Sequence, residues 1–235
     1  MYPGQCHACG VYLNGRIQNS ICDSCRATIR HIESPFCSRC GLPFTGNISI
    51  EFQCENCTTI NPAFDSARSA VYSNGVVREI IHQFKYGNAR HLELFLGLLL
   101  MARAMPELEG RQWNVVMPVP LHPVRERERG CNQSSFLASM LAENLGVPFV
   151  EDIVSRVKNT DTQSTLGRDA RLKNMRGAFI PAQNLDISGQ SIIIVDDVMT
   201  TGATVSACAK ALKQAGADHV VAWTVARGGL GADLT

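Results

Sequence analysis

The chain has 235 residues, of which 45% are hydrophobic and 18% charged, and its formal net charge is +1. A chain of this length can bury one or two hydrophobic cores, and its near-neutral charge gives no bulk attraction to nucleic acid or to membranes. The longest uncharged apolar run, residues 94–102, is nine residues long, whereas a membrane-spanning helix needs about 20. The N-terminal stretch MYPGQCHACG lacks the basic start and apolar core of a signal peptide. We therefore expect a globular, cytoplasmic protein with no membrane span.

Eight of the ten cysteines lie in the first sixty residues, as four pairs with C-x2-C spacing. Each such turn directs two thiolates to one point, and two turns complete a tetrahedral zinc site. The pairs predict two structural zinc sites with the ligands Cys6, Cys9, Cys22, Cys25, Cys37, Cys40, Cys54 and Cys57. A disulfide framework is disfavoured in a reducing compartment, and a redox-active C-x2-C motif would not need four copies.

We expect the cysteine pairs to combine in sequence order, although their spacing is also compatible with a cross-braced arrangement. Residues 1–60 hold four arginines and four acidic side chains. Each zinc centre with four thiolate ligands adds two formal negative charges, so this module is net acidic and unsuited to strong non-specific phosphate binding. A structural or partner-docking role fits it better. The proline-containing segment 61–65 is interpreted as a linker between this zinc module and a second domain over 66–235.

The second domain alternates apolar β-type runs with amphipathic helical stretches, which is the pattern of an α/β fold. The expected strands are 67–72, 114–119, 147–150, 191–195 and 219–225, and the expected helices are 76–84, 89–105, 133–145 and 203–215. Pro106 is expected to end the second helix. The last two strands are apolar without alternation, as in parallel strands covered on both faces.

The stretch IIIVDDVMTTGAT, residues 192–204, joins an apolar strand to two carboxylates and then to a loop rich in threonine and glycine. Ligands bind at the carboxyl edge of a parallel sheet. The free N–H groups at the start of the next helix make such a loop an anion cradle. A sugar phosphate suits both the acidic pair and the loop, because its 2′- and 3′-hydroxyls can donate to Asp196 and Asp197 while its 5′-phosphate binds the loop. The alternative is a strand and a well-capped helix with acidic residues in the turn.

The same stretch resembles the phosphoribosyl-pyrophosphate (PRPP) loop of type I phosphoribosyltransferases. The resemblance extends to the ComF/GntX-like (ComFC) family of bacterial DNA uptake and utilisation through the stretches FKYGNARHL (84–92), PVPLHPVRERERGCNQS (118–134) and QSTLGRDARLKNMRGAF (163–179). The cysteine-rich front is also typical of that family. The resemblance therefore implies a type I phosphoribosyltransferase-like fold, a Rossmann-like parallel sheet with flanking helices, preceded by a double zinc-ribbon module.

Carried over to this chain, the resemblance assigns Asp196 and Asp197 to the ribose hydroxyls. It assigns the 5′-phosphate to the loop formed by Val198, Met199, Thr200, Thr201, Gly202, Ala203 and Thr204. Arg125 and Arg129 become candidate pyrophosphate ligands, and if their loop is extended, residues 125, 127 and 129 point to one side. The alternative for these arginines is a solvated mixed-charge turn. Asn132 and Gln133 are expected to position the site at a helix start.

Residues 156–176 carry six basic and two acidic side chains. By resemblance they form a mobile flap that neutralises pyrophosphate and excludes water; the alternative is a solvated charged face. Three further residues are candidate ligand contacts: Gln163, Arg171 and Asn174, which match the family's pattern. Lys85 is a candidate phosphate contact. Cys131 stands where the family usually has an aromatic residue, which argues against base stacking by this loop.

The implied activity is Mg²⁺-dependent phosphoribosyl transfer from PRPP, with release of pyrophosphate, to an acceptor that no residue pattern identifies. Such a glycosyltransferase must position the ribose, neutralise the leaving group and exclude water. One alternative is a non-catalytic protein that binds or transports single-stranded DNA beside a DNA-uptake helicase, with an affinity that falls steeply as salt rises. A third interpretation is a PRPP-sensing regulator with the zinc module as its partner surface.

Overall fold

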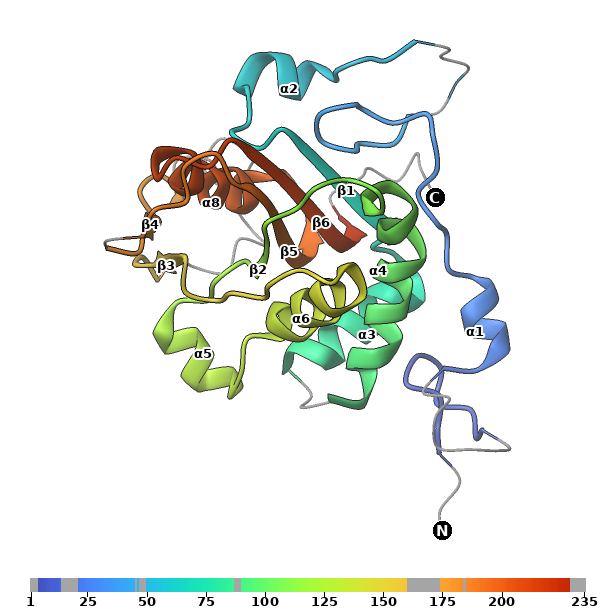
Figure 1. The fold of residues 1–235 in the computed structure, drawn as a ribbon. Coiled ribbons are helices and arrows are strands. Elements are labelled where there is room, and N and C mark those ends of the chain that lie inside the picture. Colours follow the sequence, from blue (N-terminus) through green and yellow to red (C-terminus); the bar gives the residue numbers. More distant parts are fainter. Residues whose placement is uncertain are drawn as a thin grey trace.

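The computed structural model describes residues 4–13, 21–44, 46, 50–86, 90–159, 174–183 and 185–228. A parallel sheet lies at its centre, with helices on both faces and the cysteine-rich module along one side (Figure 1). The strand order is β1–β6–β5–β2, from β1 (Ser66–Tyr72), β6 (His219–Arg227), β5 (Ser191–Met199) and β2 (Val115–Pro118). The neighbours pair in parallel throughout, so the carboxyl ends of all four strands meet at one edge. The predicted α/β fold is confirmed.

Alternating side chains of β5 build two separate cores. Ile193 and Val195 pack on one face of the sheet, whereas Ile192 and Ile194 pack on the other. The first face is covered by α3 (Gly75–Tyr86), α4 (Glu93–Leu108) and α6 (Gln133–Leu145). The second face is covered by α8 (Ala203–Gln214) and the antiparallel hairpin of β3 (Val154–Arg156) and β4 (Phe179–Pro181). Two-sided burial explains why β5 and β6 are apolar without alternation.

Three of the predicted boundaries are wrong. The strand predicted over 191–195 continues to Met199 as β5, so it includes the two aspartates. The predicted strand 147–150 is reduced to a single bridge between Phe149 and Val116, because Pro148 has no N–H to extend a ladder. Helix α4 continues through Pro106 to Leu108. Its last turn is anchored instead by packing, since Leu108 is buried and its carbonyl accepts a hydrogen bond of 3.0 Å from the Trp113 indole. A short 3-10 turn, η1 (Arg90–Leu92), precedes this helix.

The N-terminal module packs directly on the sheet. It contains two short helices, α1 (Asp23–Ala27) and α2 (Glu55–Ile60). The segment predicted as a linker is itself packed, because Phe64 is fully buried and the Asp65 N–H donates to the Val220 carbonyl at 2.7 Å. The division of the chain at residue 60 stays a prediction. Within the described ranges, no helix has both the length and the apolar character needed to cross a bilayer.

Candidate functional site

Two groups of four cysteines gather their sulfur atoms in sequence order. In each group the four Sγ atoms lie within 4.8 Å of one another: Cys6, Cys9, Cys22 and Cys25 in the first, and Cys37, Cys40, Cys54 and Cys57 in the second. Both groups use the same turn. The Gly10 N–H donates to the Cys6 carbonyl and the Gly41 N–H to the Cys37 carbonyl, each at 2.8 Å, and both glycines have a positive φ. The expected sequential pairing is therefore confirmed, and the cross-braced alternative is excluded.

The thiol environment fits zinc. Backbone N–H groups point at sulfur in both groups, as in the 3.4 Å contact from Cys22 N to Cys6 Sγ and the 3.3 Å contact from Cys54 N to Cys37 Sγ. Four thiolates can share so small a space only around a cation, and tetrahedral sets of four thiolates select zinc.

The predicted pair of carboxylates lies within the last four residues of β5. Asp197 is buried, and its Oδ1 is 2.8 Å from Lys85 Nζ at the end of α3. Asp196 Oδ1 accepts a hydrogen bond of 3.0 Å from the Ser134 hydroxyl and one of 2.9 Å from the Asp197 N–H. Helices α3 and α6 thus each supply a polar side chain to the acidic pair.

This arrangement makes the two acids unequal. Burial, followed by the neighbouring charge of Asp197, raises the pKa of Asp196 to about 6. For Lys85, burial acts to lower the pKa, but the Asp197 carboxylate outweighs it and raises the pKa. The site therefore combines a Lys–Asp ion pair with a carboxyl group that titrates close to neutrality, a combination that is common at functional sites.

The acidic pair lines a cavity of about 200 Å³. Its polar lining residues are Lys85, Arg125, Arg129, Asn132, Gln133, Ser134, Arg156, Asp196, Asp197, Thr200 and Thr204. From the predicted phosphate loop, Val198, Thr200 and Thr204 reach this cavity, whereas Met199 and Ala203 are buried in the core and Thr201 borders a different cavity. Gly202, with a φ of 77°, is the N-cap of α8. Because Thr204 in the first turn lines the cavity, the N-terminal end of this twelve-residue helix lies beside it.

The arginines after β2 lie on a helix, α5 (Pro123–Arg129), and not on an extended loop. Pro123 occupies the first turn, and His122 accepts a hydrogen bond from the Val124 N–H, which caps the helix start. On a helix, residues four apart share a face. Arg125 and Arg129 therefore line the 200 Å³ cavity together, while Arg127 does not. The alternation of 125, 127 and 129 expected for an extended loop is wrong.

The other residues predicted to contact the ligand differ in whether they line the cavity. Asn132 caps α6 by accepting from the Ser134 N–H at 3.2 Å, and its side chain also donates to the Val119 carbonyl at 3.0 Å. Gln133 is buried and accepts from Arg129 at 3.4 Å. Asn174 is half-buried and does not line the cavity. Gln163 and Arg171 fall outside the described residues.

Two further residues line the cavity that the sequence does not mark as ligand contacts. Ser134 follows the predicted Asn132 and Gln133 in the sequence, but nothing in the spacing links it to Asp196. Arg156 stands out in the sequence only as part of a basic segment. It ends β3, where its guanidinium lies 5.7 Å from the centre of the Phe179 ring. Burial lowers the pKa of Arg156, and the Asp196 carboxylate partly compensates.

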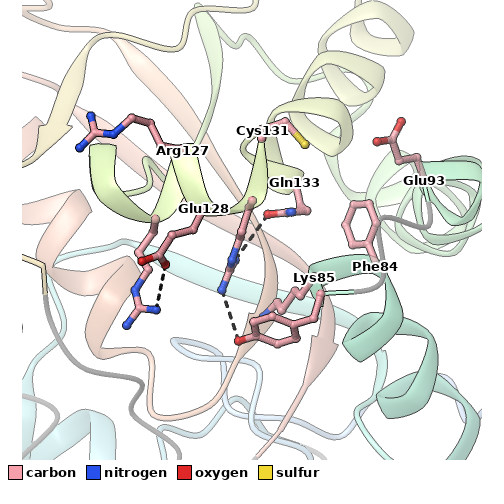
Figure 2. A pocket seen from close by; sticks show the side chains of 11 residues that line it. Phe84, Lys85, Glu93, Arg127, Glu128, Cys131 and Gln133 are labelled. Carbon is pink, nitrogen blue, oxygen red and sulfur yellow. Dashed lines mark hydrogen bonds and ion pairs between the residues drawn. The ribbon is translucent and has the colours of Figure 1, made fainter.

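A larger cavity of about 510 Å³ adjoins the first and shares four residues with it, Lys85, Arg125, Arg129 and Gln133. Figure 2 shows that Arg127 projects from α5 away from the other labelled side chains, whereas Gln133 accepts the hydrogen bond from Arg129. The exposed ring of Tyr86 also lines this cavity, and the Arg129 guanidinium lies 5.1 Å from its centre. Cys131 lies at the rim of the cavity, half-buried.

Two parts of the chain match known protein families. Residues 1–58 match the double zinc ribbon domain, and residues 132–233 match the phosphoribosyl transferase domain. The DNA utilization protein YhgH of Salmonella typhi is 31% identical over 230 residues, which cover 96% of this chain and 97% of that protein. Competence protein F of Haemophilus influenzae is 29% identical over 223 residues, covering 89% and 97%.

Among solved structures, an adenine phosphoribosyltransferase from Thermoanaerobacter pseudethanolicus covers 71% of this chain and 93% of its own at 17% identity, with a TM-score of 0.37. The relatives found by sequence are more informative than this structure, because the matched region covers 89–96% of the chain and so includes the zinc sites, the sheet and the cavity. The chain belongs to the ComF family, in which a double zinc ribbon precedes a type I phosphoribosyltransferase fold.

Proposed function

We propose that the 200 Å³ cavity binds PRPP or a related sugar phosphate, and that the chain transfers the phosphoribosyl group to an acceptor. The observation that supports this most directly is the combination in one cavity of two carboxylates, two threonines beside a helix N-terminus and four basic side chains. The carboxylates suit hydroxyl groups, the helix start suits a phosphate, and the cations suit a second, more highly charged phosphate group.

In this proposal the acidic pair holds the ribose. Lys85 fixes the orientation of Asp197 through their 2.8 Å contact, so that Asp197 can accept a hydrogen bond from a ring hydroxyl. Asp196 accepts from the second hydroxyl while Ser134 fixes its orientation. The 5′-phosphate lies against Thr200 and Thr204, where the dipole of α8 favours negative charge.

Transfer requires the bond between ribose C1 and pyrophosphate to break as the acceptor nucleophile bonds to C1 and loses its proton. Arg125, Arg129 and Arg156 lie where they can neutralise the departing pyrophosphate. The oxygen atoms of Asp196 and Asp197 are ligands of the kind that Mg²⁺ prefers, and Mg²⁺ bound with PRPP would add positive charge at the leaving group. The names of the relatives support a role for this chemistry in DNA uptake or utilisation.

Calorimetry with PRPP, with and without Mg²⁺, tests the proposal. The wild-type chain is expected to bind PRPP, and a variant with both Asp196→Asn and Asp197→Asn is expected to lose that binding while keeping its far-ultraviolet circular dichroism. Unchanged binding in the variant would show that the ligand lies elsewhere. A screen for pyrophosphate release with nucleobases, nucleotides and single-stranded DNA then tests transfer and identifies the acceptor.

A second candidate function is binding of single-stranded DNA, which the adjoining 510 Å³ cavity favours. Three basic residues, Arg125, Arg127 and Arg129, are among its lining residues, and the exposed Tyr86 ring offers a surface on which a base can stack. Arg127→Gln is expected to weaken oligonucleotide binding and reduce its salt dependence, while PRPP binding stays unchanged because Arg127 does not line the smaller cavity. Equal oligonucleotide affinity of wild type and variant would argue against this candidate.

A further inference from the structure

The buried side chain of Arg227 connects the second zinc site to the sheet. Arg227 ends β6 and is only 5% exposed. Its Nη1 donates to the Cys40 carbonyl at 2.7 Å, and its Nη2 lies 3.7 Å from the Cys40 sulfur, within hydrogen-bonding range for sulfur. The guanidinium thus contacts a metal ligand at both the backbone and the side chain.

The charge of Arg227 requires an anion nearby, because an uncompensated buried cation is strongly unfavourable. Among the residues that the structure describes, no aspartate or glutamate forms an ion pair with it. A zinc ion with four thiolate ligands carries two formal negative charges. The thiolate cluster that contains Cys40 is therefore the counter-ion of Arg227, and Arg227 in turn neutralises part of the cluster.

Arg227 also lies next to the predicted phosphate loop, residues 198–204. Arg227 pairs with Met199 across β5 and β6, and the N–H of the next residue, Gly228, donates to the Met199 carbonyl at 2.9 Å. Gly228 lies so close to the loop that a Cβ on it would be 3.2 Å from the Thr200 methyl group. A cavity of about 220 Å³ between the two sites is lined by both, with Arg227 and Thr201 among its residues.

We infer that Arg227 is a positioning residue that stabilises zinc in the second site and, through it, holds the phosphate loop in its binding conformation. Occupancy of the second zinc site and affinity for PRPP are then thermodynamically linked, each strengthening the other; this second half rests on the proposed function. The first zinc site packs on α3 and α4 instead, where His7 contacts Gln83 of α3 and Arg26 lies over Phe95 of α4.

The zinc half is tested by chelator competition on the full-length protein, following release of the two metals. Arg227→Gln is expected to weaken zinc binding at one site by about 10- to 100-fold, the usual effect of removing a partner of a metal ligand. Arg227→Lys, which keeps the charge, is expected to recover most of that loss. Arg103→Gln is the matched control, because Arg103 also donates to a carbonyl of the N-terminal module, that of Ile32 at 2.8 Å, but contacts no zinc ligand. Two unchanged zinc affinities in Arg227→Gln would overturn the inference.

The linkage half is tested by PRPP calorimetry on variants that each lose one zinc ligand or its partner. Cys40→Ser and Arg227→Gln are expected to weaken PRPP binding by about fivefold or more, whereas the control Arg103→Gln leaves it unchanged. Equal affinities in all variants would overturn the linkage. If the wild-type chain itself does not bind PRPP, the proposed function fails, and the chelator experiment still decides whether Arg227 stabilises the zinc centre.

Discussion

Lys85 and Asp197 form an ion pair of 2.8 Å between residues 112 positions apart in the chain, with the side chains 23% and 8% exposed. The pair fastens the end of α3 to the end of β5, which makes Lys85 a partner of the acidic pair as well as a candidate phosphate contact. Loss of one member of such a pair leaves the other charged and buried, which is worse than losing both.

Lys85→Met is therefore expected to lower the free energy of unfolding by about 2–4 kcal/mol, somewhat below the range for a fully buried pair because Lys85 is partly exposed. Urea denaturation measures this change. Lys213→Met is the control, because Lys213 pairs with Asp65 at a similar distance of 2.7 Å, but with both side chains about 30% exposed. An exposed pair contributes about 1 kcal/mol or less. Equal effects of the two substitutions would contradict the buried ion pair.

The raised pKa of Asp196 predicts a pH dependence of ligand binding. If only the ionised carboxylate accepts a hydrogen bond from ribose, PRPP affinity should rise as pH increases through about 6. The stability of the fold should change in the opposite sense. The folded state holds the Asp196 proton more tightly than the unfolded chain. The contribution of Asp196 to the free energy of unfolding is therefore largest below about pH 4 and is lost as pH rises through 6.

Calorimetry between pH 5 and 8 measures the binding curve, with Asp196→Asn as control, because the phosphates of PRPP also titrate in this range. The variant should retain only the ligand's own pH dependence. Identical curves for wild type and variant would show that Asp196 does not titrate in the site.

Ser134→Ala removes the hydroxyl that donates to Asp196 at 3.0 Å. Since this hydrogen bond favours the ionised carboxylate, its loss should raise the pKa of Asp196 further and shift the rise in PRPP affinity to higher pH. The free energy of unfolding should fall by about 1 kcal/mol at pH 8. Ser135→Ala is a close control, because the neighbouring hydroxyl is buried without a hydrogen-bond partner among the described residues. A shift with Ser135→Ala as large as with Ser134→Ala would refute the assignment.

Metal analysis should find two zinc ions per chain. Removal of both with a chelator should expose the cysteine-lined interior of the N-terminal module, because tetrahedral thiolate sites supply folding energy of their own. Elemental analysis combined with thiol titration checks this: the native protein should react slowly at its eight zinc-binding cysteines and at the buried Cys208, and faster only at the half-buried Cys131. A stoichiometry of one metal or none would contradict the two-site arrangement.

The sequence alone predicts those parts of the site whose chemistry is local. Paired C-x2-C turns and the run from β5 into the threonine loop each place their residues through short-range geometry, so their arrangement follows from spacing. Helix α5 could also have been predicted from the sequence. Pro123 in a first turn and the i, i+3 spacing of Arg125 and Glu128 are helix signals, although the alternating charges obscured them. In the structure these two side chains pair at 3.2 Å.

The remaining contacts depend on the packing of distant segments. Lys85 reaches Asp197, Ser134 reaches Asp196 and Arg227 reaches Cys40 only because the sheet order β1–β6–β5–β2 brings their elements together. Register and strand order are set by the whole core, and no single spacing in the chain specifies them.

Gly41 illustrates how little space separates the zinc-binding turn from strand β1. Its φ is 65°, and a Cβ at this position would lie 2.6 Å from the Ala67 carbonyl oxygen, closer than any real side chain can come. The Arg39 carbonyl also accepts a hydrogen bond of 2.7 Å from the Ala67 N–H. Heating should therefore melt the turn and the strand in one cooperative transition, because neither can detach without breaking contacts of the other.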